Sequence, residues 1–328
     1  MSETVVNTVL GPIAPEEMGI TLPHEHLCFG YPGWEGDATV APLDPEAVVT
    51  AGTEVLEGLK QFGVGTYVDA TTNDCGRQPE ILREVSRRTG VHIVCSTGYY
   101  YEGEGAPVYW KFRSTLGDIR GELYELFHRE VTEGIRDTGI RAGVIKVGSS
   151  KGEITDYERI LFETAARVQA ETGVPIITHT QEGTMGAEQA HLLIDAGADP
   201  ARIQIGHMSD NLDVDAQIEV LEQGVFVAWD RMGLQGIVGC PMDEQRYDVL
   251  AELIEKGYAN QLLLSHDFII SWLGRPLKLP EPLLPLLANW NPAHLFNGVI
   301  PALRERGVTE EQIRTMTEDN PRRLFGGR

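Results

Sequence analysis

The chain has 328 residues, of which 42% are hydrophobic, so it can bury a large core either as two ordinary domains or as one large barrel. Its 49 acidic and 27 basic residues give a formal net charge of -22 at pH 7, which repels phosphate backbones and anionic lipid surfaces. We therefore expect neither nucleic acid nor membranes as partners.

The cysteine pattern and the amino terminus indicate a cellular compartment. Cys28, Cys75, Cys95 and Cys240 lie far apart and form no CxxC pair, as is typical of reduced thiols. The first residues lack a basic region followed by an apolar stretch, and no later run approaches the length of a membrane span. We expect a cytoplasmic protein.

Short apolar runs rich in Val and Ile alternate with amphipathic stretches, which is the pattern of parallel strands joined by helices. Eight strands are predicted: Gly19–His26, Thr66–Ala70, His92–Thr97, Gly143–Val147, Pro175–His179, Ile203–His207, Val225–Trp229 and Leu262–Asp267. Predicted helices between them include Pro45–Phe62, Ile119–Asp137, Asp156–Thr172, Gly186–Ala196, Asp213–Gln223 and Glu244–Lys256. Eight alternations without a low-complexity linker predict one α/β domain over residues 1–328, a closed (β/α)8 TIM barrel.

The connections between these elements carry two kinds of signal. Asp44 and Asp213 stand where helix N-caps belong. Two connections, Tyr99–Thr115 and Phe268–Pro292, are longer than their helices need. Because they are rich in aromatic residues and leucine, we expect them to form an apolar substrate wall rather than disordered loops.

Polar side chains stand where the predicted strands end. His24 and His26 lie two apart on the first strand and so point to the same side, which is a typical start for a zinc-like site that needs further ligands. The carboxyl ends of all eight barrel strands open on one face, so polar residues at other strand ends would join them in one cavity. Those residues are Lys146, His179, His207 and Asp267.

Lys146 is the most informative of these residues. An ammonium that faces a barrel interior is heavily penalised unless it is neutralised, paired or modified. Burial favours the neutral amine, which can take up carbon dioxide as a carbamate. The two carbamate oxygens could each bind one metal ion.

Five motifs occur together in a defined order: His24-Glu25-His26, Gly143-Val144-Ile145-Lys146, Thr178-His179-Thr180, Gly206-His207 and Ser265-His266-Asp267. In this order the chain resembles the phosphotriesterase-like branch of the amidohydrolase superfamily. The match runs from Gly11-Pro12-Ile13 to Asp319-Asn320-Pro321-Arg322-Arg323, nearly the whole chain. HxH alone would be a weak signal, whereas the set is highly specific.

The resemblance implies a binuclear metal site. The more buried ion would be held by His24, His26 and Asp267, and the more exposed ion by His179 and His207, with N6-carboxylated Lys146 and a hydroxide bridging both. Zinc is the expected ion, and manganese, cobalt, iron and nickel also suit mixed nitrogen and oxygen ligands. Asp267 would also act as general acid and base, taking a proton after attack and passing it to the leaving group.

Two further residues are candidates for a catalytic role. Tyr100 matches the tyrosine that lactonase relatives place over the metals, with plain loop packing as the alternative. Arg231 follows the seventh predicted strand, where relatives carry Asp-Arg-aromatic-Gly, and is either a salt-bridged structural residue or a substrate contact. Met232 replaces the aromatic residue of that pattern, which leaves the acyl-side pocket undefined.

Other polar residues are predicted to have structural or solvated roles rather than catalytic ones. Glu25 and His266 alternate away from the site and have a supporting or packing role. The remaining histidines, including His294, are expected to be structural or solvated. Acidic helical faces such as Glu130–Glu133 are interpreted as solvated surface.

The resulting hypothesis is a binuclear metal-dependent hydrolase that opens a carboxylic ester, with a lactone as the first candidate. Phosphotriester hydrolysis, as in an aryldialkylphosphatase, is the alternative within the same site, and hydrolysis of an N-acyl amide is a third. The non-enzymatic alternative is a metal-containing protein that binds an apolar ligand. The expected partner is a small lactone, ester or organophosphate, and the resemblance also implies a homodimer.

Overall fold

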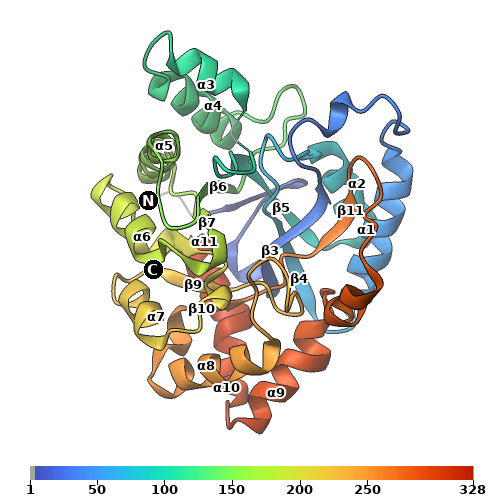
Figure 1. The fold of residues 1–328 in the computed structure, drawn as a ribbon, viewed down its shortest axis with the longest axis vertical. Coiled ribbons are helices and arrows are strands. Elements are labelled where there is room, and N and C mark those ends of the chain that lie inside the picture. Colours follow the sequence, from blue (N-terminus) through green and yellow to red (C-terminus); the bar gives the residue numbers. More distant parts are fainter. Residues whose placement is uncertain (1–3, 106, 328) are drawn as a thin grey trace.

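The computed structural model describes residues 4–105 and 107–327. In this part of the chain the main sheet has nine strands, each parallel to its neighbours, in the order β10-β9-β8-β7-β6-β5-β4-β3-β11. The sheet curls on itself, and helices surround it (Figure 1). The chain therefore has the predicted α/β fold, a (β/α)8 TIM barrel.

All eight predicted strands are present, with small shifts of their ends. Their observed bounds are β3 (Ile20–Phe29), β4 (Val64–Asp69), β5 (His92–Gly98), β6 (Val144–Ser149), β7 (Ile176–Thr180), β8 (Ile203–Ile205), β9 (Phe226–Trp229) and β10 (Leu262–Leu264). The ninth strand, β11 (Ile269–Trp272), was not predicted, and neither was the antiparallel hairpin of β1 (Val6–Thr8) and β2 (Gly11–Ile13).

The six predicted helices are also present. They are α1 (Pro45–Lys60), α4 (Arg120–Thr132), α5 (Asp156–Thr172), α6 (Gly186–Asp195), α7 (Val214–Leu221) and α8 (Asp243–Glu255). Asp44 and Asp213 accept hydrogen bonds from the first backbone N–H groups of α1 and α7, which confirms both N-caps. Helices that were not predicted are α2 (Pro79–Thr89), α3 (Val108–Ser114), α9 (Ile300–Glu305), α10 (Glu310–Arg314) and α11 (Asn320–Gly326).

The eighth barrel strand is broken where it reaches the site. The parallel register with β9 ends at the pair Leu264 and Trp229, and the chain pairs again as β11, which lies beside β3. Across the break, Asp267 N donates to His24 O at 3.1 Å and His26 N donates to Phe268 O at 2.9 Å. These bonds join the last strand to the first and place Asp267 beside the HxH motif.

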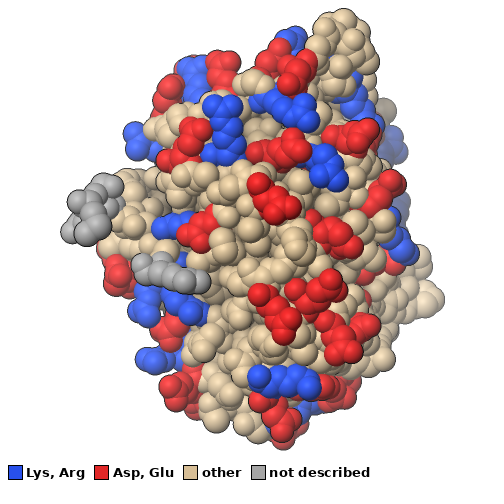
Figure 2. All heavy atoms as spheres, turned by 90° about the vertical axis from the view of Figure 1, so that its left-hand side faces the viewer, with Lys and Arg blue, Asp and Glu red and all other residues tan. Residues whose placement is uncertain are grey.

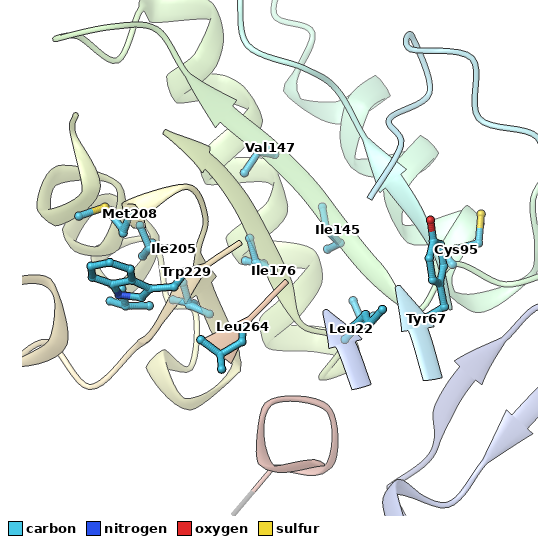
Figure 3. Close-up of a cluster of buried hydrophobic side chains, with 14 of the residues drawn as sticks. Leu22, Tyr67, Cys95, Ile145, Val147, Ile176, Ile205, Met208, Trp229 and Leu264 are labelled. Atoms are coloured by element: carbon cyan, nitrogen blue, oxygen red, sulfur yellow. The ribbon is translucent and has the colours of Figure 1, made fainter. Parts of the chain in front are cut away.

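Alternation along the strands separates two apolar regions. Residues such as Ile145, Val147 and Ile176 point outward and belong to the large cluster that includes helix residues, part of which is drawn in Figure 3. Val144 and Ile177 belong instead to a smaller cluster with residues of the N-terminal hairpin and α11. Two positions further along the same strands stand Lys146 and His179, so the barrel interior changes from apolar to polar towards the carboxyl ends of the strands.

Charged side chains of both signs are found on the face of the molecule that Figure 2 shows. On the described atoms of the face in Figure 2, acidic and basic side chains are interspersed and do not form one continuous basic area. None of the helices in the described part of the chain combines the length and the hydropathy needed to cross a bilayer.

Candidate metal centre and active site

The structure brings all six predicted metal-binding side chains together at the carboxyl ends of the strands. Lys146 Nζ lies 2.8 Å from His24 Nε2, and His26 Nε2 lies 2.9 Å from Asp267 Oδ1. The imidazole rings of His179 and His207 are 4.6 Å apart between centroids. Ligand atoms of His24, His207 and Asp267 all lie within 4.8 Å of one another, although His24 is in β3, His207 follows β8 and Asp267 follows β10.

Three of the four histidines are held by their Nδ1 atoms. His24 Nδ1 and His207 Nδ1 lie 2.6 and 3.0 Å from the two oxygens of Asp230, which is fully buried. His26 Nδ1 lies 2.8 Å from Thr71 Oγ1, whose own proton goes to Cys28 O. Each of these rings therefore presents its Nε2 atom to the cavity.

His179 has the opposite orientation. Its Nε2 lies 2.8 Å from Gln181 Oε1, and Tyr101 stacks on its ring at 4.8 Å with an interplanar angle of 11°. Among the described residues, its buried Nδ1 has no hydrogen-bond partner. A buried ring nitrogen without a partner lowers stability, and a cation bound at this atom would provide the partner that the described protein atoms do not.

A second observation also fits a cation. Since Thr71 donates elsewhere, the Nδ1 of His26 must be the donor to Thr71, and a neutral His26 then has a lone pair on Nε2. This lone pair faces the Asp267 carboxylate at 2.9 Å, and two acceptors at such a distance need a proton or a metal ion between them. The donor set of imidazoles, carboxylate and lysine thus fits the metals that the sequence predicts.

Burial sets the protonation states of the cluster. Lys146 is 1% exposed, and the loss of hydration lowers its pKa to about 8 against the attraction of Asp267 and Asp230. Burial and the positive charge of Arg231 hold the pKa of His179 and the pKa of His207 well below the usual value. Neutral imidazoles and a lysine that is readily deprotonated are the forms that metal binding and carboxylation require.

Asp267 keeps its charge although it is buried. Burial alone would raise its pKa, but the positive charge of the nearby Arg231 helps to hold the pKa well below that of a free aspartate. Arg231 Nε donates to Asp267 Oδ2 at 3.0 Å, and Arg231 Nη1 donates to Asp210 Oδ2 at 2.8 Å. Arg231 is therefore salt-bridged and also lines the cavity.

The cavity above this cluster has a volume of about 220 Å³ and apolar walls. Both long connections contribute to the wall, as predicted, because Tyr100 comes from the first and Trp272, Leu277, Leu279, Leu287 and Trp290 come from the second. The ring of Tyr100 lies 4.9 Å from that of His179. Met232 is buried in the large apolar cluster and does not appear in the described lining. In the segment that directly follows it, the residues that line the cavity are Leu234, Ile237 and Val238.

The prediction for Glu25 and His266 is confirmed, and the structure gives it detail. The carboxylate of Glu25 is buried and accepts from Ser265 Oγ, His266 Nδ1 and Phe268 N at 2.7 to 2.8 Å. These donors lie on both sides of Asp267, which has a positive φ of 54°. Glu25 therefore holds the turn that aims Asp267 at the site.

The interpretation of Glu130 as solvated surface is wrong. This side chain is buried, and its carboxylate accepts two hydrogen bonds from Arg77 at 2.8 and 2.9 Å and one from Thr97.

Sequence reasoning also missed the role of Asp230, which orients His24 and His207. The available signal was its place directly after β9, where the other strands carry polar site residues.

Comparison with known proteins extends over nearly the whole chain. Residues 4–325 match the family model for the phosphotriesterase family. An aryldialkylphosphatase of Saccharolobus solfataricus is 33% identical over 318 residues, which cover 95% of this chain and 96% of the relative. The solved structure of an organophosphorus hydrolase from Deinococcus radiodurans has a TM-score of 0.97 and 56% identity, covering 99% of this chain and 98% of that one. A mutant of a PTE-like lactonase from Deinococcus radiodurans has a TM-score of 0.96 and 55% identity, covering 98% and 100%.

Proposed function

Because this chain belongs to the phosphotriesterase family and is a hydrolase, we propose that it opens neutral lactones with apolar substituents and hydrolyses aryl phosphotriesters more slowly. The family consists of binuclear metal-dependent hydrolases. Our proposal adds the substrate class, the ligand of each metal and the role of each catalytic side chain.

The observation that carries the substrate proposal is the combination of an apolar wall with cations that are already paired. The two cationic side chains in the described lining are Lys146, which contacts His24, and Arg231, which is bonded to two carboxylates. Glu104 adds a further negative group to the lining. A substrate with its own carboxylate or sulfonate would find no unpaired cationic side chain in the described lining, whereas a neutral lactone or phosphotriester loses little by entering.

The proposed metal ligands are donor atoms that face the cavity, divided between two ions as the family resemblance implies. His24, His26 and Asp267 would hold one divalent ion, His179 and His207 the second, and a carbamate on Lys146 would lie between them, with zinc as the expected metal and manganese, cobalt, iron or nickel as alternatives. When bound, the two ions supply a hydroxide nucleophile at neutral pH and polarise the carbonyl group of the substrate.

The protein's own side chains then transfer the proton and hydrogen-bond the substrate. Asp267 takes the proton of the attacking oxygen and delivers it to the alkoxide that leaves when the ring opens. Arg231 keeps this carboxylate ionised and oriented before attack. Burial raises the pKa of Tyr100 well above its usual value, so its hydroxyl stays protonated and can donate to the carbonyl oxygen.

The choice between the two neutral substrates rests on the relatives. Structures that share 55% and 56% of their sequence with this chain are described as a PTE-like lactonase and as an organophosphorus hydrolase. A third, at 54% identity, is described as organophosphate hydrolysis engineered from a weak promiscuous lactonase template, which supports the lactone as the first candidate. Phosphotriester hydrolysis remains the second candidate because tetrahedral phosphorus resembles the tetrahedral intermediate of lactone opening.

A substrate screen of the metal-loaded protein tests the proposal. The panel would contain acyl-homoserine, aliphatic and sugar lactones, an aryl phosphotriester and an N-acyl amino acid. We expect kcat/KM for a lactone with an alkyl side chain to exceed that for the phosphotriester by at least about 100-fold, which corresponds to about 2.7 kcal/mol of transition-state binding. A higher kcat/KM for the N-acyl amino acid would contradict the proposal.

Two further proposals concern the protein in the cell. All four cysteines are buried free thiols, which supports a reducing, cytoplasmic compartment.

A homodimer is proposed because Leu277, Leu279 and Leu284 leave apolar surface exposed, and the first two of them also line the cavity. Light scattering at micromolar concentration should give twice the mass of the chain, and a monomer mass would contradict the dimer.

A further inference from the structure

The guanidinium of Arg231 belongs to a buried chain of alternating charges. Arg231 donates to Asp267 on one side and to Asp210 Oδ2 on the other. The second oxygen of Asp210 accepts from Arg246 Nη2 at 3.1 Å. Arg246 in turn donates from Nη1 to Asp243 Oδ1 at 3.0 Å. Neither the side chain of Asp210 nor that of Arg246 is exposed at all.

Arg246 also bonds the backbone that carries Arg231. Its Nη1 donates to the carbonyl oxygens of Arg231 and Leu234 at 2.7 and 2.8 Å, and its Nε donates to Ser209 O at 3.1 Å. One guanidinium on α8 therefore connects the segment after β8 with the segment after β9. The fixed, planar arrangement of arginine donors suits this task, which the single ammonium of lysine cannot reproduce.

A neighbour on the same helix strengthens this connection. Both oxygens of Asp243 accept from Gly233 N, at 3.2 and 3.1 Å. Gly233 has a φ of 87°, and a Cβ there would lie 2.2 Å from Asn289 O. Residues 231–234 are thus held at several backbone groups, and the position of the Arg231 side chain follows from them.

We propose that Arg246 is a positioning residue for the hydrolytic reaction: through Asp210 and through the carbonyl of Arg231, it fixes the Arg231 guanidinium against Asp267. This inference rests on the proposed function only for its effect on turnover. If Arg246 is shortened, Asp210 keeps its charge but loses one of its two cationic partners, and the carbonyl of Arg231 loses its donor. The Arg231 side chain then samples positions away from Asp267, and displacements near 1 Å lower turnover substantially.

A double-mutant cycle separates positioning from general damage. Arg246→Lys is measured alone and combined with Arg231→Met, as kcat/KM of the metal-loaded enzyme on an aliphatic lactone. We expect Arg246→Lys to lower kcat/KM about tenfold when Arg231 is present and less than about twofold when Arg231 is absent. Equal losses in both backgrounds would overturn the proposal.

The matched control is Arg77→Lys. Arg77 is also a buried, ion-paired arginine, bonded to Glu130 and to Ser96 O rather than to any residue of the Arg231 network. Its effect on kcat/KM should be the same factor with and without Arg231. Should Arg246→Lys not fold, Asp243→Asn replaces it, because this change weakens the bond to Arg246 Nη1 while keeping the size of the side chain.

A readout without substrate makes the inference independent of the activity. In protein labelled with 15N-arginine, the Nε–H signal of Arg231 is identified by its loss in Arg231→Met. We expect its hydrogen exchange to be about tenfold faster in Arg246→Lys and unchanged in Arg77→Lys. An unchanged exchange rate in Arg246→Lys would refute positioning even if lactones are hydrolysed. Absence of lactone turnover in the unmodified protein, with faster exchange in Arg246→Lys, would refute the proposed substrate alone.

Discussion

Asp267 occupies a backbone conformation that an aspartate adopts only when its surroundings enforce it. Its φ of 54° lies in the left-handed region, where a non-glycine residue costs roughly 1 to 3 kcal/mol. The carboxylate of Glu25 binds the backbone N–H groups of His266 and Phe268 on either side. The strain is therefore held by a buried anion, and it turns the Asp267 side chain towards the histidines.

The first prediction concerns the proton that Asp267 carries. Asp267→Asn preserves the size of the side chain and one oxygen ligand but cannot take up a proton. We expect two metal ions per chain to remain and kcat on a lactone to fall by about 10² to 10⁴-fold. Elemental analysis and steady-state kinetics on the same preparation check this, and turnover close to that of the unmodified protein would show that the proton goes elsewhere.

The second prediction concerns the reversed orientation of His179. Gln181→Ala removes the acceptor for His179 Nε2–H, so the ring loses the bond that keeps Nδ1 towards the cavity. We expect the affinity for the second metal to fall by about 10 to 100-fold in a chelator competition assay. Gln181→Glu keeps an acceptor and serves as the control. Equal affinities of the alanine and glutamate variants would contradict this role.

These site residues differ in how far the sequence reveals them. The six side chains proposed to bind metal lie at or near the carboxyl ends of strands, and a barrel must gather these ends at one face, so their meeting could be predicted. The orientation of each imidazole could not, because Asp230 lies 206 positions from His24 along the chain and contacts it only once the barrel has closed. The same holds for Arg246, which looks like an ordinary charged residue of an amphipathic helix.

At the scale of elements, the ion pair between Arg77 and Glu130 ties the segment after β4 to helix α4. Glu130 lies on the buried face of α4 together with Leu123, Phe127 and Val131, so its burial follows the helix period although neighbouring acidic residues are exposed. Its partner is 53 positions away, and no periodicity within the helix indicates that contact. The predicted ends of β10 differ for a similar reason, since the break after Leu264 depends on Glu25 from the first strand.

The third prediction follows from this buried pair. Arg77→Met leaves the Glu130 carboxylate buried without its cation, and we expect a loss of about 3 to 5 kcal/mol in the free energy of unfolding by urea. Combining it with Glu130→Leu should recover most of the loss. A single-variant loss below about 1 kcal/mol would show that the pair contributes little.

The pair also sets a pH dependence. Burial opposes ionisation of Glu130, but Arg77 outweighs it and lowers the pKa of the carboxyl group. A folded-state pKa below that of the unfolded chain means that the stabilisation is complete at neutral pH and is lost as the pH falls below the range of a free glutamate, through the lowered pKa. In Arg77→Met burial is no longer outweighed, so the pKa of Glu130 in the folded state should lie above that of the unfolded chain. Acidification from neutral pH should then increase the free energy of unfolding of this variant.

At the scale of the whole molecule, the apolar runs were sufficient to predict eight strands and a closed barrel. Closure itself required no local signal, because eight strand-helix units whose sheet is apolar on both faces bury both of them when the sheet closes and helices cover its outside. The N-terminal hairpin and the helices after residue 299 could not be predicted, since short elements with little periodicity are fixed by tertiary contacts with residues such as Leu324.

The fourth prediction is that residues 1–328 unfold as one domain. The large apolar cluster and the smaller one are formed by opposite faces of the same strands, so neither can be lost while the other remains. Calorimetry of the metal-free protein should show a single transition whose van't Hoff and calorimetric enthalpies agree. Two resolved transitions would contradict a single domain.

We propose above all that two metal ions bind among His24, His26, Lys146, His179, His207 and Asp267. Anomalous diffraction at the zinc absorption edge from crystals of the zinc-loaded protein tests it most directly. The account predicts two peaks about 3.5 to 4 Å apart within this cluster, with electron density for a carboxylate continuing from Lys146 Nζ between them. A single peak, peaks elsewhere in the barrel, or an unmodified Lys146 that still contacts His24 would contradict it.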